Sequence, residues 1–153
     1  MARQRIEHRA TTTADPATVY RLLRDGATWP EWGPIDSVDL EREGTSDREG
    51  VGAVRVLRSG RVKGRDTIAE LVENRRFSYT HESSLPVKNY RGDIDLDPLP
   101  DGGTAIRWVS EFDPKVPGTG ALVRRGLDGF IAKLVDGLAK RATADAAARR
   151  AAA

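Results

Sequence analysis

The chain of 153 residues contains no cysteine, only two histidines, and three residues each of tryptophan, tyrosine and phenylalanine. Without cysteine it cannot form a disulfide, a thiolate nucleophile or a cysteine-based zinc site. Two histidines are also few for a metal centre, in which several nitrogen or sulfur ligands converge. We therefore expect no metal and no cofactor.

The sequence also lacks a long hydrophobic run and a dominant charge. No apolar stretch approaches the ~20 residues of a membrane span, and the start, residues 1–8, lacks the apolar core of a signal peptide. The 25 basic and 23 acidic residues are interspersed, and Arg149 and Arg150 are typical of a solvated helix end. These patterns predict a cytoplasmic protein without stable membrane insertion and without a nucleic-acid partner.

The end of the chain predicts one long amphipathic helix after the break at 114–118. At ~100° per residue its apolar side chains form one stripe, which must pack on an apolar surface. The stripe consists of Val123, Leu127, Phe130, Ile131, Leu134, Val135 and Leu138. We expect a single domain over residues 1–148 and a disordered or frayed tail over 149–153.

The rest of the chain is typical of strands, with two short helices after the first. Residues 5–12 predict a strand, Asp15 and Pro16 suit the start of a helix, and Asp25-Gly26 suits its end. Thr28 and Glu31 have capping-box spacing, which predicts a second short helix carrying Trp32. Short turns favour antiparallel pairing of six further strands, at 37–43, 52–59, 61–73, 76–83, 89–97 and 104–112.

Alternation with a period of two predicts which side chains share the covered face of this sheet. It is clear in the two last strands, and it places Phe77, Tyr79 and His81 inward together. The facing of 61–73 stays open, because Ile68 and Val72 oppose Ala69 and Leu71. The other inward residues expected are Val54, Val56, Arg58, Tyr90, Gly92, Ile94, Leu96, Ile106, Trp108, Ser110 and Phe112.

Several local segments, together spanning almost the whole chain, carry a resemblance to a known superfamily. They are residues 15–20 (DPATVY), 29–32 (WPEW), 85–92 (LPVKNYRG), 103–108 (GTAIRW) and 112–118 (FDPKVPG). With the order of elements, the chain resembles the helix-grip superfamily called START-like or SRPBCC, which includes polyketide cyclases/dehydrases and lipid-transfer domains. The resemblance implies an α+β fold with a curved antiparallel sheet of about seven strands around the C-terminal helix. It also implies an internal cavity for apolar small molecules, but no shared catalytic set.

The expected cavity lies where the apolar faces of the helix and sheet meet. Tyrosine hydroxyls and indole nitrogens on a concave face need partners, and a ligand could supply them. The residues expected to contact a ligand are Trp32, Val54, Val56, Arg58, Tyr79, His81, Tyr90, Trp108, Ser110, Arg124, Phe130 and Leu134.

The histidine and the two arginines in this set each have a functional and a structural interpretation. His81, with Tyr79, could act as a general acid or base, or could be a strand-end histidine bonded to backbone or water. Arg58 and Arg124 could bind an anionic group of a ligand, or could pair with a local carboxylate.

The sequence thus predicts a binding protein that holds a small hydrophobic or amphipathic ligand, lipid-like or polyketide-like. The alternative is a polyketide cyclase/aromatase or dehydrase that uses the same cavity. A third possibility, a protein-interaction module, would need a large exposed apolar patch, which no segment demands. Oligomeric state and ligand identity stay open.

Overall fold

The computed structural model describes residues 3–153; residues 1 and 2, where the expected domain begins, lie outside the described residues. The fold is α+β, as predicted. Seven strands are followed by one long helix, and short helices lie between the first two strands. The elements are β1 (Gln4–Thr12), α1 (Pro16–Arg24), η1 (Gly26–Thr28), α2 (Trp29–Trp32), β2 (Ser37–Arg42), β3 (Val54–Ser59), β4 (Val62–Val72), β5 (Arg76–Ser83), β6 (Val87–Pro98), β7 (Thr104–Pro114) and α3 (Gly120–Ala152).

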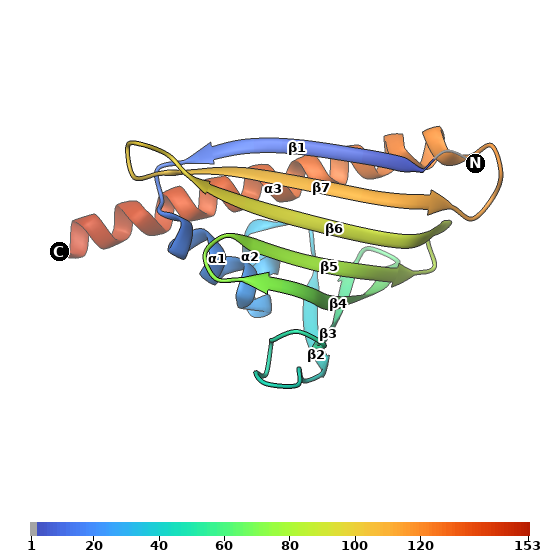
Figure 1. Cartoon of the computed structure of the whole chain (residues 1–153), viewed down its shortest axis with the longest axis horizontal. Coiled ribbons are helices and arrows are strands. Elements are labelled where there is room, and N and C mark those ends of the chain that lie inside the picture. The colour runs from blue at the N-terminus through green and yellow to red at the C-terminus, as the bar shows by residue number, and fades with distance from the viewer. Residues whose placement is uncertain (1–2) are drawn as a thin grey trace.

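The strands form one antiparallel sheet in the order β1-β7-β6-β5-β4-β3-β2. The sheet curves, and α3 crosses it on one side, packed against β1 and β7 (Figure 1). The short helices α1 and α2 lie on the same side of the sheet and contact α3. The predicted helix-grip fold is therefore confirmed.

The connection between β1 and β2 is fixed by caps and buried tryptophans. Asp15 caps α1 by accepting from the backbone N of Thr18, as its position before Pro16 predicts. The capping box predicted at Thr28 does not form. The Thr28 hydroxyl group instead donates to the carbonyl of Leu22 and accepts from the indole nitrogen of Trp32, and these two bonds join α2 to α1.

The register of β3 is the opposite of the one expected. Leu57 and Ser59 lie on the side of the sheet that α3 covers. Arg55 lies on the same side and contacts the rings of Trp29 and Phe77. The predicted inward orientation of Val54, Val56 and Arg58 is therefore wrong. Arg58 is exposed on the outer face and pairs with Asp39 there, at 2.9 Å.

A β-bulge explains why the facing of β4 could not be read from the sequence. The pairing with β5 shifts between Ile68 and Glu70, so that Ile68 lies opposite Tyr79 and Leu71 lies opposite Phe77. The extra residue, Ala69, changes the parity of the strand. Asp66 consequently faces inward, whereas Glu70 belongs to the outer face.

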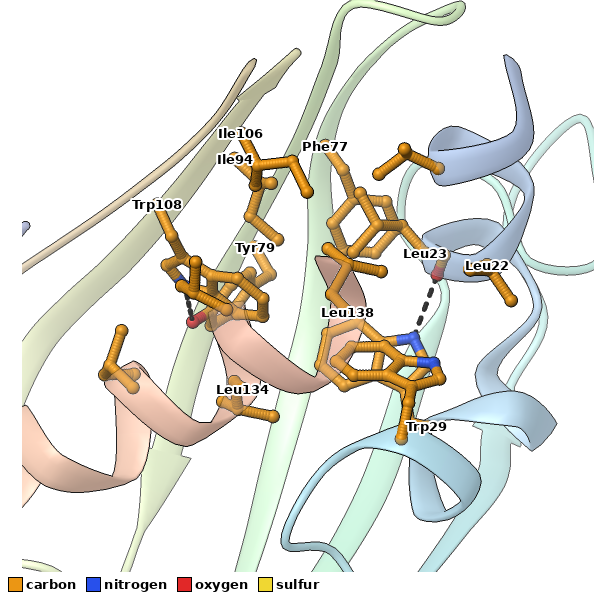
Figure 2. Close-up of a cluster of buried hydrophobic side chains, with 14 of the residues drawn as sticks. Leu22, Leu23, Trp29, Phe77, Tyr79, Ile94, Ile106, Trp108, Leu134 and Leu138 are labelled. Carbon is orange, nitrogen blue, oxygen red and sulfur yellow. Dashed lines mark hydrogen bonds between the residues drawn. The ribbon is translucent and has the colours of Figure 1, made fainter. Parts of the chain in front are cut away.

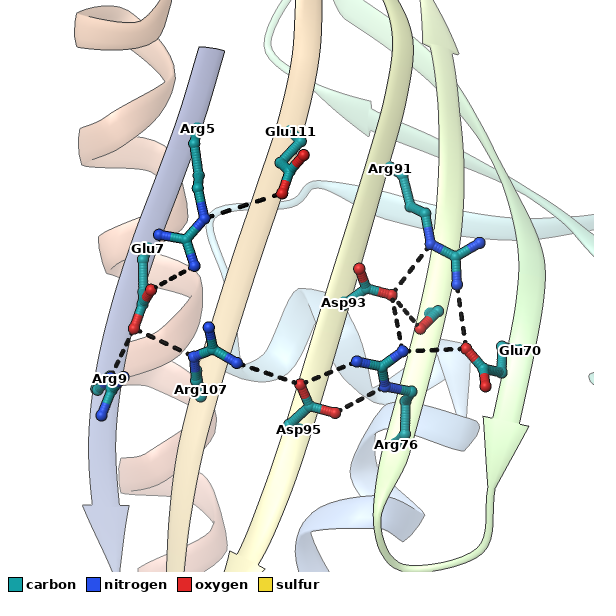
Figure 3. A network of polar contacts seen from close by, with 11 residues as sticks. Arg5, Glu7, Arg9, Glu70, Arg76, Arg91, Asp93, Asp95, Arg107 and Glu111 are labelled. Atoms are coloured by element: carbon teal, nitrogen blue, oxygen red, sulfur yellow. Dashed lines mark hydrogen bonds and ion pairs between the residues drawn. The ribbon is translucent and has the colours of Figure 1, made fainter. Parts of the chain in front are cut away.

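The outer face of the sheet carries alternating charges that pair across five strands (Figure 3). Glu7 accepts from Arg9, Arg107 and Arg5, which together lower the pKa of its carboxyl group to about 2. Asp95 pairs with Arg76 at 2.7 Å, and Arg76 continues the network toward β4. This pairing leaves the outer face mostly polar, so the main apolar core lies on the α3 side.

Helix α3 approaches α2 closely at Gly137. A Cβ atom at this position would collide with the carbonyl oxygen of Trp32, so only glycine allows the contact. The helix continues to Ala152, four residues past the boundary expected after residue 148, and Arg149 donates to the hydroxyl of Thr18 at 3.2 Å. None of the helices in residues 3–153 is long and apolar enough to cross a membrane.

Candidate functional site

A cavity of about 410 Å³ lies between the first half of α3 and the inner face of β3–β6. Its walls are mostly aliphatic and aromatic, with a few polar groups. The lining residues are Trp29, Ile35, Leu57, Ser59, Val62, Gly64, Asp66, Tyr79, His81, Leu85, Pro86, Tyr90, Val123, Gly126, Leu127, Phe130, Ile131 and Leu134. Cavities of this size and character bind small molecules in many proteins.

The polar groups on the sheet wall centre on a hydrogen-bonded pair, Asp66 and His81. The two residues lie directly opposite each other on β4 and β5, and His81 Nδ1 is 2.6 Å from Asp66 Oδ1. The Asp66 side chain is 10% exposed and that of His81 is 18% exposed. With the carboxylate accepting from Nδ1–H, the imidazole is held in one orientation and its Nε2 has no partner among residues 3–153.

Two glycines make room for the rings of the sheet wall. A Cβ atom at Gly64 would press on the imidazole of His81, and one at Gly92 would overlap the ring of Tyr79. Each glycine lies on a strand next to the ring, and the ring occupies the space that a Cβ atom would fill. The orientation of His81 therefore depends on Gly64 as well as on Asp66.

The tyrosines next to this pair stay protonated at neutral pH. Burial raises the pKa of Tyr90 to about 12 and that of Tyr79 well above its ordinary value. Trp108 Nε1 donates to the Tyr79 hydroxyl at 3.1 Å (Figure 2). Ser110 Oγ lies close to both tyrosines and offsets part of the shift, although it has no partner at hydrogen-bonding geometry among residues 3–153.

The end wall of the cavity is built around the buried Arg55. Its guanidinium donates to the carbonyls of Leu23 (3.1 Å) and Arg24 (2.7 Å) at the C-terminus of α1, and pairs with Glu49 at 2.9 Å. It also lies over the ring of Trp29, whose indole nitrogen donates to Leu23 as well (Figure 2). Arg55 therefore fixes the position of the one tryptophan that lines the cavity.

The structure brings five of the predicted site residues into the cavity wall: Tyr79, His81, Tyr90, Phe130 and Leu134. Trp32, Trp108 and Ser110 are buried behind the wall. Val54, Val56 and Arg58 lie on the opposite side of the sheet, for the reason given above. Arg124 is exposed on α3 and forms no ion pair within residues 3–153.

Sequence reasoning missed Asp66 and Trp29. Asp66 belonged to the strand whose facing stayed open, and only the bulge at Ala69 aligns it with His81. A signal was present, because the turn at 73–75 makes a hairpin in which residues near 66 must face residues near 81. Trp29 lacked any such signal, since its place depends on its contacts with Arg55, Trp32 and Trp108.

The fold and the cavity define the chain as a START-like, helix-grip protein, which confirms the resemblance. The family described as "Polyketide cyclase / dehydrase and lipid transport" matches residues 3–143, and the chain belongs to this family. A comparison with curated proteins finds no match.

Solved structures agree on the fold. A START superfamily protein from Mycobacterium smegmatis superposes with a TM-score of 0.76 at 16% identity, over 90% of this chain and 96% of that one. Ara h 8.0201 gives 0.75 at 18% identity, over 94% and 99%. A protein from Thermobifida fusca gives 0.74 at 24% identity, over 90% and 92%.

Proposed function

We propose that the protein binds one small hydrophobic or amphipathic molecule, lipid-like or polyketide-like, in the cavity under α3. The observation that carries the proposal is an apolar hollow of about 410 Å³ with hydrogen-bonding groups gathered on one wall. Burial of apolar ligand surface would supply most of the affinity, at about 25 cal/mol per Å² removed from water. Membership in a family of cyclases and lipid carriers supports this function.

The polar wall would set the orientation of the ligand. His81 and Tyr90 line a region that is otherwise mostly apolar, and Nε2 of His81 lacks a partner within residues 3–153, which is costly where water is excluded. A ligand hydroxyl or carbonyl group at this wall would satisfy them. The preferred ligand is therefore apolar along most of its length and polar at one end.

Filling the cavity from the helix should weaken ligand binding. Gly126 lines the cavity and a Cβ atom there meets open space, so Gly126→Trp adds a large ring at the cavity wall with no clash at its Cβ. We expect the affinity for an apolar fluorescent probe such as N-phenyl-1-naphthylamine to fall about tenfold or more, since about 1.4 kcal/mol of lost apolar contact suffices.

The matched control for this experiment is Gly129→Trp. Gly129 is exposed on the same helix, a Cβ atom there also meets open space, and it does not line the cavity. Both variants replace a helical glycine, so both gain helix propensity. Equal probe affinity in the two variants would contradict binding in this cavity.

The Asp66–His81 pair favours a second candidate function, proton transfer in a polyketide cyclase or dehydrase. A histidine oriented by a carboxylate is a common general base, and a neutral tyrosine can donate to a carbonyl oxygen. In this case His81 Nε2 would accept a proton from the bound polyketone and Tyr90 would stabilise the charge on its oxygen.

Replacing His81 by glutamine separates the two functions. Glutamine keeps the volume and a donor but cannot shuttle a proton near neutral pH. If the pair only orients the ligand, probe affinity should change by no more than one hydrogen bond, about 0.5–1.5 kcal/mol. If it catalyses, turnover of a model polyketone should fall about 10²–10⁴-fold with probe binding intact. We expect the first result, and parent turnover that collapses in the variant would establish the enzyme.

A further inference from the structure

The mouth of the cavity is surrounded by an exposed surface with an unusual composition. This mouth surface consists of residues 84–88, between β5 and β6, and residues 114–126, at the end of β7 and the start of α3. The backbone N of Lys115 donates to the carbonyl of Pro86 at 3.0 Å, which joins the two segments. Pro86, Val123 and Gly126 also line the cavity, so the mouth surface is continuous with it.

Two large apolar side chains project from the mouth surface into solvent. Leu122 is 73% exposed and Val116 is 52% exposed, the highest values among the exposed large hydrophobic residues of the described chain. Neither side chain is needed to build the core. Exposed apolar side chains beside an apolar cavity are a feature of surfaces at which partners bind.

The charges of the mouth surface have one sign. Its two segments contain four cations, Lys88, Lys115, Arg124 and Arg125, and no acidic residue. None of the four forms an ion pair within residues 3–153, in contrast to the paired charges on the outer face. The neighbouring acids have other direct partners: Asp113 pairs with Arg3 and accepts from Asn89, and Asp128 bonds to His8. Lys88 lies opposite Asp113 and interacts with it only electrostatically, so Lys115, Arg124 and Arg125 are the cations farthest from compensation.

The two arginines are adjacent in the second turn of α3, and both are exposed. A negatively charged partner would neutralise both cations. The mouth surface thus combines exposed apolar side chains with unpaired cations around an apolar cavity.

We propose that the mouth surface docks on an anionic phospholipid membrane. Leu122 and Val116 enter the headgroup region, and the four cations lie against the lipid phosphates. A hydrophobic ligand then passes between bilayer and cavity without crossing water. The charges alone would also suit an acidic protein. The choice of a membrane rests on the proposed function, because the cavity that would hold an apolar ligand opens within the docked surface.

The test is flotation of the whole protein with vesicles of phosphatidylcholine alone or mixed with phosphatidylglycerol. We expect binding to the mixed vesicles, weakened by salt, and little binding to phosphatidylcholine alone. Loss of each cation should cost about fivefold in affinity. The double variant Arg124→Glu/Arg125→Glu should therefore bind about twentyfold more weakly or worse. Leu122→Ser should weaken binding about tenfold through the lost apolar contact.

The matched control is Lys140→Glu/Arg150→Glu, which makes the same change in net charge on the exposed side of α3. Lys140 lies roughly 20 Å along the helix from Arg125, beyond the Debye length at physiological salt. We expect this variant to bind mixed vesicles as the parent does. An equal loss in the control would mean non-specific attraction and would overturn the proposal.

Three other results would overturn it as well. One is a parent protein that ignores the mixed vesicles, and another is charge-reversed and Leu122→Ser variants that bind them normally. The third is concentration-dependent self-association in sedimentation that Leu122→Ser abolishes, which would make a second copy of the chain the occupant. Probe titration is independent of flotation, so vesicle binding without probe binding would reject only the cavity function, and the reverse would reject only the docking.

Discussion

Replacement of Arg55 by alanine is expected to lower the free energy of unfolding by about 3–5 kcal/mol, the range for breaking a buried, hydrogen-bonded charge pair. The side chain is 3% exposed, and its loss leaves the Arg24 carbonyl without this donor and the Glu49 carboxylate with the backbone N of Gly26 but no cation. It also removes the cation that lies over Trp29 and Phe77. Urea unfolding followed by tryptophan fluorescence measures the change.

The control is Arg58→Ala on the same strand. Arg58 is 45% exposed and pairs with Asp39 on the outer face, so its loss should cost no more than about 1 kcal/mol. The comparison also tests the register of β3, because a register shifted by one residue would exchange the two results. A larger effect at Arg58 than at Arg55 would refute the inward position of Arg55.

Truncation of Trp108 to alanine is the second substitution with a large expected effect, about 3–5 kcal/mol of lost stability. Trp108 is fully buried, contacts Trp29 and Tyr79, and donates to the Tyr79 hydroxyl. The variant leaves a cavity next to the existing one and removes the partner of a buried hydroxyl group. The shift of the midpoint in chemical denaturation measures the loss.

Trp108→Phe is the companion variant, since it keeps an aromatic ring at this position and loses the indole N–H with part of the ring volume. We expect it to cost clearly less than Trp108→Ala, because only the hydrogen bond to Tyr79 and part of the ring volume are lost. A midpoint shift near zero for Trp108→Ala would place residue 108 on the surface and contradict the register of β7.

Where the periodic pattern was strong, the sequence alone predicted the structure well. The stripe of α3 and the inward faces of β5, β6 and β7 are as expected, because the helix repeats its apolar residues at the helical period and the strands have a period of two. Asp15 and Pro16 likewise marked the start of α1, since cap preferences act within one turn. Local chemistry decides these elements, and local chemistry is visible in one sequence.

The failures came from residues whose environment is set by distant parts of the chain. In β3 the two valines suggested an inward face, whereas Arg55 is inside because the end of α1 offers carbonyl acceptors. In β4 a single extra residue at the bulge decides whether Asp66 meets His81. The sequence therefore identified one residue of the polar pair in the candidate site, His81, but not its partner Asp66.

The central claim, that an apolar molecule sits under α3, is tested most directly by nuclear Overhauser contacts between N-phenyl-1-naphthylamine and methyl groups of the protein. The account predicts one bound probe with contacts to Leu57, Leu127 and Leu134, which line the cavity. Contacts confined to exposed methyl groups, such as those of Leu122, or no saturable binding at all, would contradict it.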